Sequence, residues 1–215
     1  MSKVRVWIAL VCTCDGGLSS ATAHKRISNA RQFFQDAVDR ELIGRNPFRP
    51  IKSTAGSNRE RDFFITRDLA DKVLEECTDD QWRLLFALSR FGGLRCPSEH
   101  LALRLDGVDW ERNRLRVDSP KTEHHDGKAF RMVPLFPELR PYVEQVFDSA
   151  PDGATHFITR YGSARQNLRT QLKRIIERAG LEAWPKLRHN LRASRQTELE
   201  EQFPSYVVCA WMGNG

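Results

Sequence analysis

The stretch that decides the fold is residues 82–99, WRLLFALSRFGGLRCPSE. Its first part places Trp82, Leu85, Leu88 and Phe91 on one face at helical spacing, which predicts a buried helix over Asp79–Phe91. Two glycines then break the helix, and an arginine follows two residues after the second glycine. A charged side chain directly after a buried helix and a tight turn is held in a fixed place, so this segment organises a site as well as a core.

Outward from this segment, the hydrophobic period predicts more helices and a few short strands. Helices are expected over residues 66–77, 97–103, 137–148, 163–179, 189–202 and 204–211. Between them the period changes to two, which predicts three strands around residues 108–110, 115–117 and 130–132, with a polar hairpin loop at 120–127. A short strand is also expected at 156–158. The fold class is therefore mainly α with a small antiparallel β-sheet (α+β).

The N-terminal region is expected to form a separate, smaller unit. Apolar residues at three- and four-residue spacing predict a helix over Ser19–Ile43. Asn46-Pro47 ends it, and a segment rich in Pro, Ser, Gly and charge follows. We expect residues 1–48 to be a partial helical domain, 49–62 a linker and 63–215 a second domain.

Composition favours a polyanionic partner and a reducing compartment. The net charge is +6, and residues 160–195 hold 10 basic against 2 acidic side chains. Clustered arginine is typical of nucleic-acid binding, although a solvated helix face is the alternative. The five cysteines form no CxxC pair, so neither a disulfide framework nor a metal site is expected, and the chain is expected to be cytoplasmic. The apolar stretch Val4–Cys14 is too short to cross a membrane, and a signal peptide is the less favoured reading of it.

Four segments, in order and spacing, resemble the signature boxes of the tyrosine recombinase (phage integrase) family. They are the Gly-Leu-Arg box with Arg95, a hairpin lysine at Lys121, a His-x-x-Arg box at residues 189–192, and Trp211-Met212-Gly213-Asn214 in place of a Leu-Gly-His box. The helix before residue 48 is similar to the end of the family's core-binding (DNA-binding) domain. The resemblance covers residues 18–215, and its strength lies in the joint occurrence of the boxes.

The resemblance implies site-specific DNA recombination or integration through a phosphotyrosine intermediate. Two arginines, Arg95 and Arg192, would hold the phosphate oxygens, since their fixed paired donors suit a charged phosphoryl transition state. Lys121 would protonate the leaving 5′ oxygen, and His189 would donate to the phosphate or accept the nucleophile's proton. The family uses no cofactor and no metal, and its partner is double-stranded DNA, on which an intact member forms a tetramer.

Supporting roles are expected for an acidic residue and for the last box. Glu99 would orient Arg95, although three residues separate them where the family has two, so Glu99 is either displaced or brought back at Pro97. Asn214 stands where the family has His or Trp; it can donate a hydrogen bond but transfers no proton. Weaker candidates for DNA contacts are Lys25, Arg26, His124, Arg131 and Arg188. For each of these charged residues taken alone, a solvated or structural role is the alternative.

The sequence stops at Gly215, before the place where the family keeps its nucleophile. The three tyrosines, Tyr142, Tyr161 and Tyr206, precede that place and are expected to be packing residues. We therefore expect a truncated, nucleoid-associated chain that does not cleave DNA alone and whose assembly into a tetramer is in doubt. A non-catalytic DNA-binding remnant on the same scaffold is the main alternative. A type IB topoisomerase-like enzyme and an unrelated helical regulator are less favoured.

Overall fold

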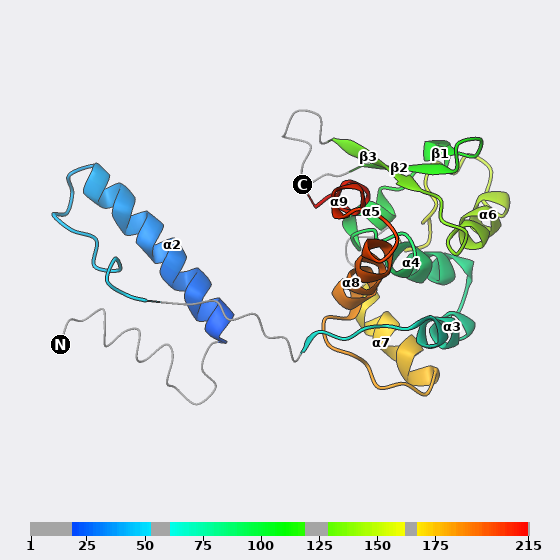
Figure 1. Ribbon diagram of the computed structural model, residues 1–215, viewed down its shortest axis with the longest axis horizontal. Helices are drawn as coiled ribbons and strands as arrows, with labels where there is room; N and C mark the ends of the chain where they lie inside the picture. Colours follow the sequence, from blue (N-terminus) through cyan, green and yellow to red (C-terminus); the bar gives the residue numbers. More distant parts are fainter. Residues whose placement is uncertain (1–18, 53–60, 119–128, 162–166, 215) are drawn as a thin grey trace. The chain divides into compact units, whose positions relative to one another are not determined.

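The computed structural model describes residues 19–52, 61–118, 129–161 and 167–214. The chain divides into two compact units, Met1–Arg59 and Glu60–Gly215 (Figure 1). The division lies inside the segment that the sequence predicts to be a linker. Among the described helices, none is long and apolar enough to cross a membrane.

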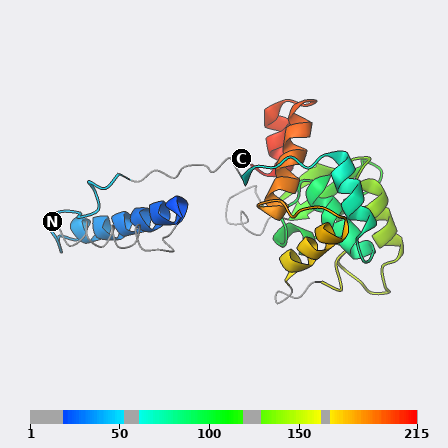
Figure 2. The same ribbon diagram turned by 90° about the horizontal axis from the view of Figure 1, so that it is seen from below.

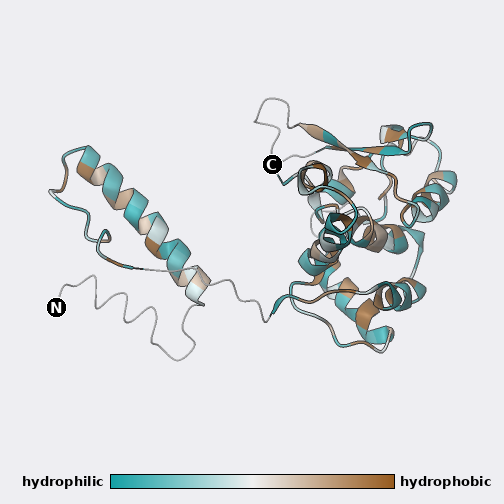
Figure 3. Ribbon diagram, viewed as in Figure 1, coloured by the Kyte–Doolittle hydropathy of each residue, from teal (hydrophilic) through white to brown (hydrophobic). Residues whose placement is uncertain are grey.

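The first unit contains one long helix, α2 (Ser20–Asp39), whose residues are mainly hydrophilic (Figure 3). Ser19 caps it by accepting a hydrogen bond from the backbone N–H of Thr22. The following segment folds back on the helix, because the Arg31 guanidinium donates to the carbonyl of Ile51 at 2.6 Å. The helix ends earlier than the predicted Ile43, and Glu41 already has a left-handed backbone with φ of 58°.

The second unit is built around α4 (Asp80–Arg90), in which eight of the eleven residues are buried. Helix α4 packs against α3 (Arg67–Glu75), α6 (Arg140–Asp148) and α8 (Leu187–Glu200). The remaining helices are α5 (Ser98–Leu101), the 3-10 turn η2 (Leu105–Gly107), α7 (Leu168–Arg178) and α9 (Ser205–Met212). Helix α9 lies beside α8 and one strand of the sheet (Figures 1 and 2).

The sheet has three antiparallel strands in the order β1 (Val108–Asp109), β2 (Arg114–Asp118) and β3 (Phe130–Pro134). Leu115 pairs with Val133, and both are fully buried, whereas Arg114 and Arg116 of β2 point to solvent. This alternation gives the sheet one buried face. The predicted class, mainly α with a small antiparallel sheet, is confirmed. The predicted strand at 156–158 is only an isolated bridge between His156 and Arg104.

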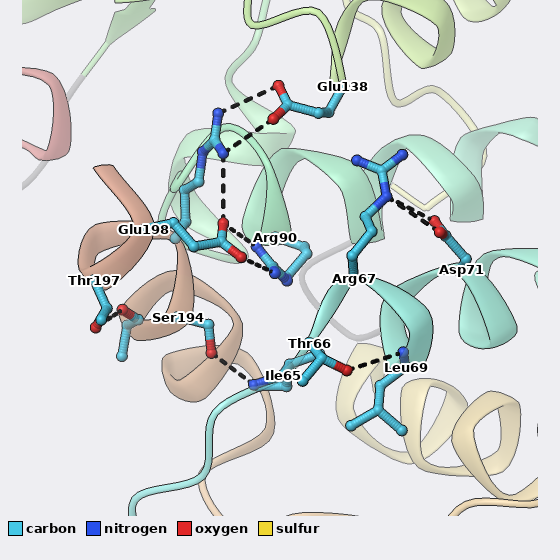
Figure 4. Close-up of polar contacts among 12 residues, drawn as sticks. Ile65, Thr66, Arg67, Leu69, Asp71, Arg90, Glu138, Ser194, Thr197 and Glu198 are labelled. Atoms are coloured by element: carbon cyan, nitrogen blue, oxygen red, sulfur yellow. Dashed lines mark hydrogen bonds and ion pairs between the residues drawn. The ribbon is translucent and has the colours of Figure 1, made fainter. Parts of the chain in front are cut away.

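A buried ionic network fixes α8 on α4 (Figure 4). Arg90 of α4 is 1% exposed and forms a two-pronged pair with Glu198 of α8. Glu198 also lies 3.4 Å from Arg195, which contacts Glu138 before α6. Because a broken buried pair leaves an uncompensated charge, this network strongly favours a single placement of α8.

Candidate phosphate-binding site

On α8, the side chain that the sequence predicts to bind phosphate is Arg192, one turn after His189. Its two terminal nitrogens donate to the carbonyl of Gly93, before α5, and to the carbonyl of Met212, at the end of α9. The same Nη2 donates to Asn214 Oδ1 at 2.9 Å. Arg192 therefore ties together three segments that are far apart in the sequence.

Arg95 reaches the same place from the turn that follows α4. Gly93 makes this turn with φ of +65°, and a Cβ there would lie 2.5 Å from the sulfur of Met212. Only glycine allows this backbone together with the close approach of α9. The Arg95 Nη2 donates to the carbonyl of Gly213 and, at 3.2 Å, to Asn214 Oδ1.

The two arginines thus converge on one oxygen, Oδ1 of Asn214. A single acceptor shared by two guanidinium groups marks a place where a negative oxygen is favoured. Burial, followed by the charge of Arg95, lowers the pKa of Arg192 to about 10. It still remains charged at neutral pH, since that pKa lies well above 7.

The carboxylate of Glu99 compensates part of the positive charge of the arginines. It is 2% exposed and accepts hydrogen bonds from the backbone N–H of Arg95 at 2.6 Å and from the Arg95 side chain at 3.0 Å. Arg131 donates to both of its oxygens, at 2.7 and 2.8 Å. Burial alone would raise the pKa of Glu99, but the hydrogen bonds and charges of Arg131 and Arg95 outweigh burial and lower it. The extra residue between Arg95 and Glu99 therefore does not displace the carboxylate.

Arg131 lies inside the protein rather than on a DNA-facing surface. Its side chain is 10% exposed, and besides Glu99 it donates to the carbonyl of Trp211 at 2.7 Å. It thereby links β3 to α9 and holds Glu99 in place. These contacts favour the structural role of Arg131, and its contact with DNA stays a prediction.

Arg188 is likewise directed inward, which differs from the expected DNA contact. Its guanidinium lies over the ring of Trp82 at 5.8 Å, and its Nη1 is buried without a hydrogen-bond partner. Burial, countered in part by the neighbouring Cys96 thiol, lowers the pKa of Arg188. This placement favours a structural role for Arg188 over the predicted DNA contact.

The remaining predicted site residues are exposed on helices or lie outside the description. His189 is exposed on the first turn of α8, and Lys25 and Arg26 are exposed on α2 of the first unit. Lys121 and His124 fall outside the described residues. In the described ranges, no group of three or more His, Cys, Asp or Glu side chains could hold a metal ion.

The sequence reasoning gave no role to two contributors to the site, although it quoted Gly213 as part of the fourth box. Gly213 has φ of +66°, and a Cβ on it would lie 3.2 Å from the guanidinium nitrogens of both Arg95 and Arg131. Its place just after a predicted helix is the signal that could have found it. Gln196, which accepts from the Asn214 amide at 3.1 Å, carries no signal in a single sequence.

The tyrosines lie away from the arginine pair. Tyr142 stacks on Phe91, and Tyr161 donates to Asp79 beside Trp82. Tyr206 is 78% exposed, so its expected packing role is wrong. It lies in the first turn of α9, whereas the arginines contact the last turn, roughly 9 Å further along the axis at 1.5 Å per residue.

Comparisons with known proteins agree with this fold. No family model matches the chain. The tyrosine recombinase XerC of Lactobacillus delbrueckii subsp. bulgaricus is 24% identical over 197 residues, which cover 85% of this chain and 64% of that protein. The chain thus spans less than two thirds of the length of this curated relative.

Solved structures share the fold at low sequence identity. The Tn1549 transposon integrase in complex with transposon right end DNA is 18% identical, with a TM-score of 0.76 over 97% of this chain and 75% of that one. A lambda integrase dimer bound to a core site is 17% identical, with a TM-score of 0.68 over 90% and 72%. The second unit therefore has the fold of an integrase catalytic domain. Together with the similarity to XerC, this fold supports the assignment of the chain to the tyrosine recombinase/integrase family. The four sequence segments resemble the signature boxes of the same family.

Proposed function

We propose that Arg95 and Arg192 together bind one phosphate of a DNA backbone, as the first step of site-specific recombination. The observation that carries the proposal is the convergence of both guanidinium groups on a single oxygen, Asn214 Oδ1. A non-bridging phosphate oxygen is an acceptor in the same way, and it also carries a share of the diester's negative charge. Charge-assisted hydrogen bonds to such an oxygen are about twice as strong as neutral ones.

The chemistry that fits this site is phosphoryl transfer from DNA to a tyrosine and back. A tyrosine oxygen attacks the phosphorus, the 5′ oxygen leaves, and negative charge develops on the oxygens held by the arginine pair. The buried Glu99 fixes Arg95 so that little reorganisation is needed. Lys121 would give a proton to the leaving oxygen, and His189 would accept the proton of the attacking tyrosine or donate to the phosphate, both by resemblance to the family. Since the phosphotyrosine bond conserves the energy of the broken one, no nucleotide cofactor is required.

We further propose that none of this chain's own tyrosines is the nucleophile. Tyr142 and Tyr161 are committed to contacts with Phe91 and Asp79, and Tyr206 starts a helix whose other end meets the arginines. The 215 residues would then bind DNA without forming a covalent link to it. A purely DNA-binding role on the same scaffold is the second candidate, and the placement of the tyrosines favours it for the chain as it stands.

Assembly on DNA is also a proposal. One relative is a lambda integrase tetramer bound to a Holliday junction. We propose that this chain belongs to a protein that acts as several copies on double-stranded DNA in the nucleoid.

The experiment is a fluorescence-anisotropy titration of a labelled duplex at several salt concentrations. Arg192→Ala should weaken binding and reduce the slope of log K against log salt by about 1, because one phosphate contact is lost. Arg112→Ala is the control: Arg112 is 74% exposed on the turn between β1 and β2, and among the described residues it forms an ion pair with Asp109. Equal affinities and slopes for the two variants would refute the phosphate-binding role of the pair.

A further inference from the structure

We infer that Gln196 and Glu200 set the direction of the Asn214 amide, and thereby tune how readily the arginine pair accepts a phosphate oxygen. Gln196 and Glu200 lie one turn apart on α8, on the turns that follow Arg192. The inference rests on the proposed phosphate-binding role of Arg95 and Arg192 and assigns a positioning role to a residue outside the family's boxes.

The evidence is a continuous relay of hydrogen bonds. Gln196 Nε2 donates to Glu200 Oε1 at 2.8 Å, and Asn214 Nδ2 donates to Gln196 Oε1 at 3.1 Å. At the other end, Asn214 Oδ1 accepts from Arg95 and Arg192 at 3.2 and 2.9 Å. Two amides are therefore held between a carboxylate and two guanidinium groups.

The two ends of the relay fix its direction. An ionised carboxylate only accepts hydrogen bonds, and a guanidinium group only donates them. The Gln196 amide must therefore point its NH2 to Glu200 and its oxygen to Asn214. It follows that Asn214 must point its NH2 to Gln196 and its oxygen to the arginines, so the orientation of each amide is determined by its neighbours.

This direction opposes phosphate binding. A phosphate oxygen that takes the same donors of Arg95 and Arg192 must displace Oδ1 of Asn214. If Asn214 turned its amide over to donate to the phosphate, its oxygen would face the oxygen of Gln196. If Gln196 turned as well, its oxygen would face the carboxylate of Glu200. The relay therefore raises the cost of exchanging Oδ1 for a phosphate oxygen.

The test uses the whole chain and dimethyl phosphate, a monoanion that mimics the DNA diester. Its dissociation constant is measured by NMR from the shifts of the Arg192 Nε–H and the Asn214 side-chain amide. Gln196→Ala removes the relay and should tighten binding about two- to fivefold, the equivalent of one exposed hydrogen bond. Gln202→Ala, an exposed glutamine at the end of the same helix region, is the matched control.

The conservative variant separates positioning from a structural effect. Gln196→Glu still accepts from Asn214 and should show no tightening relative to Gln202→Glu, which adds the same charge. The inference is overturned if Gln196→Ala binds dimethyl phosphate no more tightly than Gln202→Ala, or if Gln196→Glu tightens binding as much as Gln196→Ala does. If Arg192→Ala leaves the dissociation constant unchanged, the probe is not held by the arginine pair. The proposed function then fails, and the inference fails with it.

Discussion

Replacing Glu99 with glutamine should destabilise the second unit by about 3 kcal/mol. Glu99 is 2% exposed and accepts four hydrogen bonds from Arg95 and Arg131. Removing one partner of a buried ion pair costs about 3–5 kcal/mol, because the other charge is left uncompensated. The loss of stability expected for Glu99→Gln lies at the low end of this range, because the Arg95 side chain is 32% exposed and solvent screens part of its charge.

The assay is urea unfolding followed by circular dichroism, with Glu111→Gln as the control on an exposed turn. Because the pKa of Glu99 is lowered in the folded state, its stabilisation is present above the unfolded value near 4.5 and is lost as the pH falls below it. The wild-type chain should therefore lose stability below pH 4.5 more steeply than Glu99→Gln. If Glu99→Gln lowers the free energy of unfolding at pH 7 by less than about 0.5 kcal/mol, which is the range of ordinary surface substitutions, the reasoning is refuted.

Three further predictions concern single side chains. Gly213→Ala should lower the stability by about 1–2 kcal/mol, because the backbone at Gly213 is left-handed, and it should also weaken DNA binding. Gly180→Ala is the control, with φ of +71° and open space around it, and thermal melts should show the loss of stability without a change in DNA binding. Burial, followed by the charge of Arg188, lowers the pKa of His100 from 6.5 to about 3. The free energy of unfolding measured with urea should therefore fall by about 2 kcal/mol between pH 7 and pH 5, because the unfolded chain binds a proton there that the folded chain does not. His100→Gln should lack this change. Tyr206→Phe should leave DNA affinity unchanged, and denaturing gels should show no protein–DNA adduct for either chain; an adduct lost in the Phe variant would contradict the placement of Tyr206.

The sequence predicted the core because it depends on local patterns, whereas the arginine pair was predicted from the resemblance of four boxes to a known family. Each of these patterns lies within a few consecutive residues: the apolar stripe from Trp82 to Phe91, the Gly92-Gly93 break and the alternation in the strands. The structure has a helix and a sheet at these places. Helix ends were less accurate, as at Asp39, because a frayed last turn depends on the loop that follows.

The surroundings of the arginines could not be predicted in the same way. The pairing of Arg131 with Glu99 joins residues 32 positions apart, and the Gln196–Asn214 bond joins residues 18 apart. A single sequence contains no pattern for such tertiary partners, since any exposed-looking Arg or Gln fits them equally well. Arg188 is the clearest example: it lies in the most basic segment of the chain and is nevertheless turned onto Trp82.

The central claim is that Arg95 and Arg192 act on the same phosphate, and a double-mutant cycle tests it most directly. Duplex affinity is measured at one fixed salt concentration for Arg95→Ala, Arg192→Ala and the double variant. If the two side chains share one oxygen, the second substitution should cost much less than the first, with a coupling of about 0.5–3 kcal/mol. Strictly additive losses would mean that the arginines contact separate groups, and the account of a shared phosphate site would be contradicted.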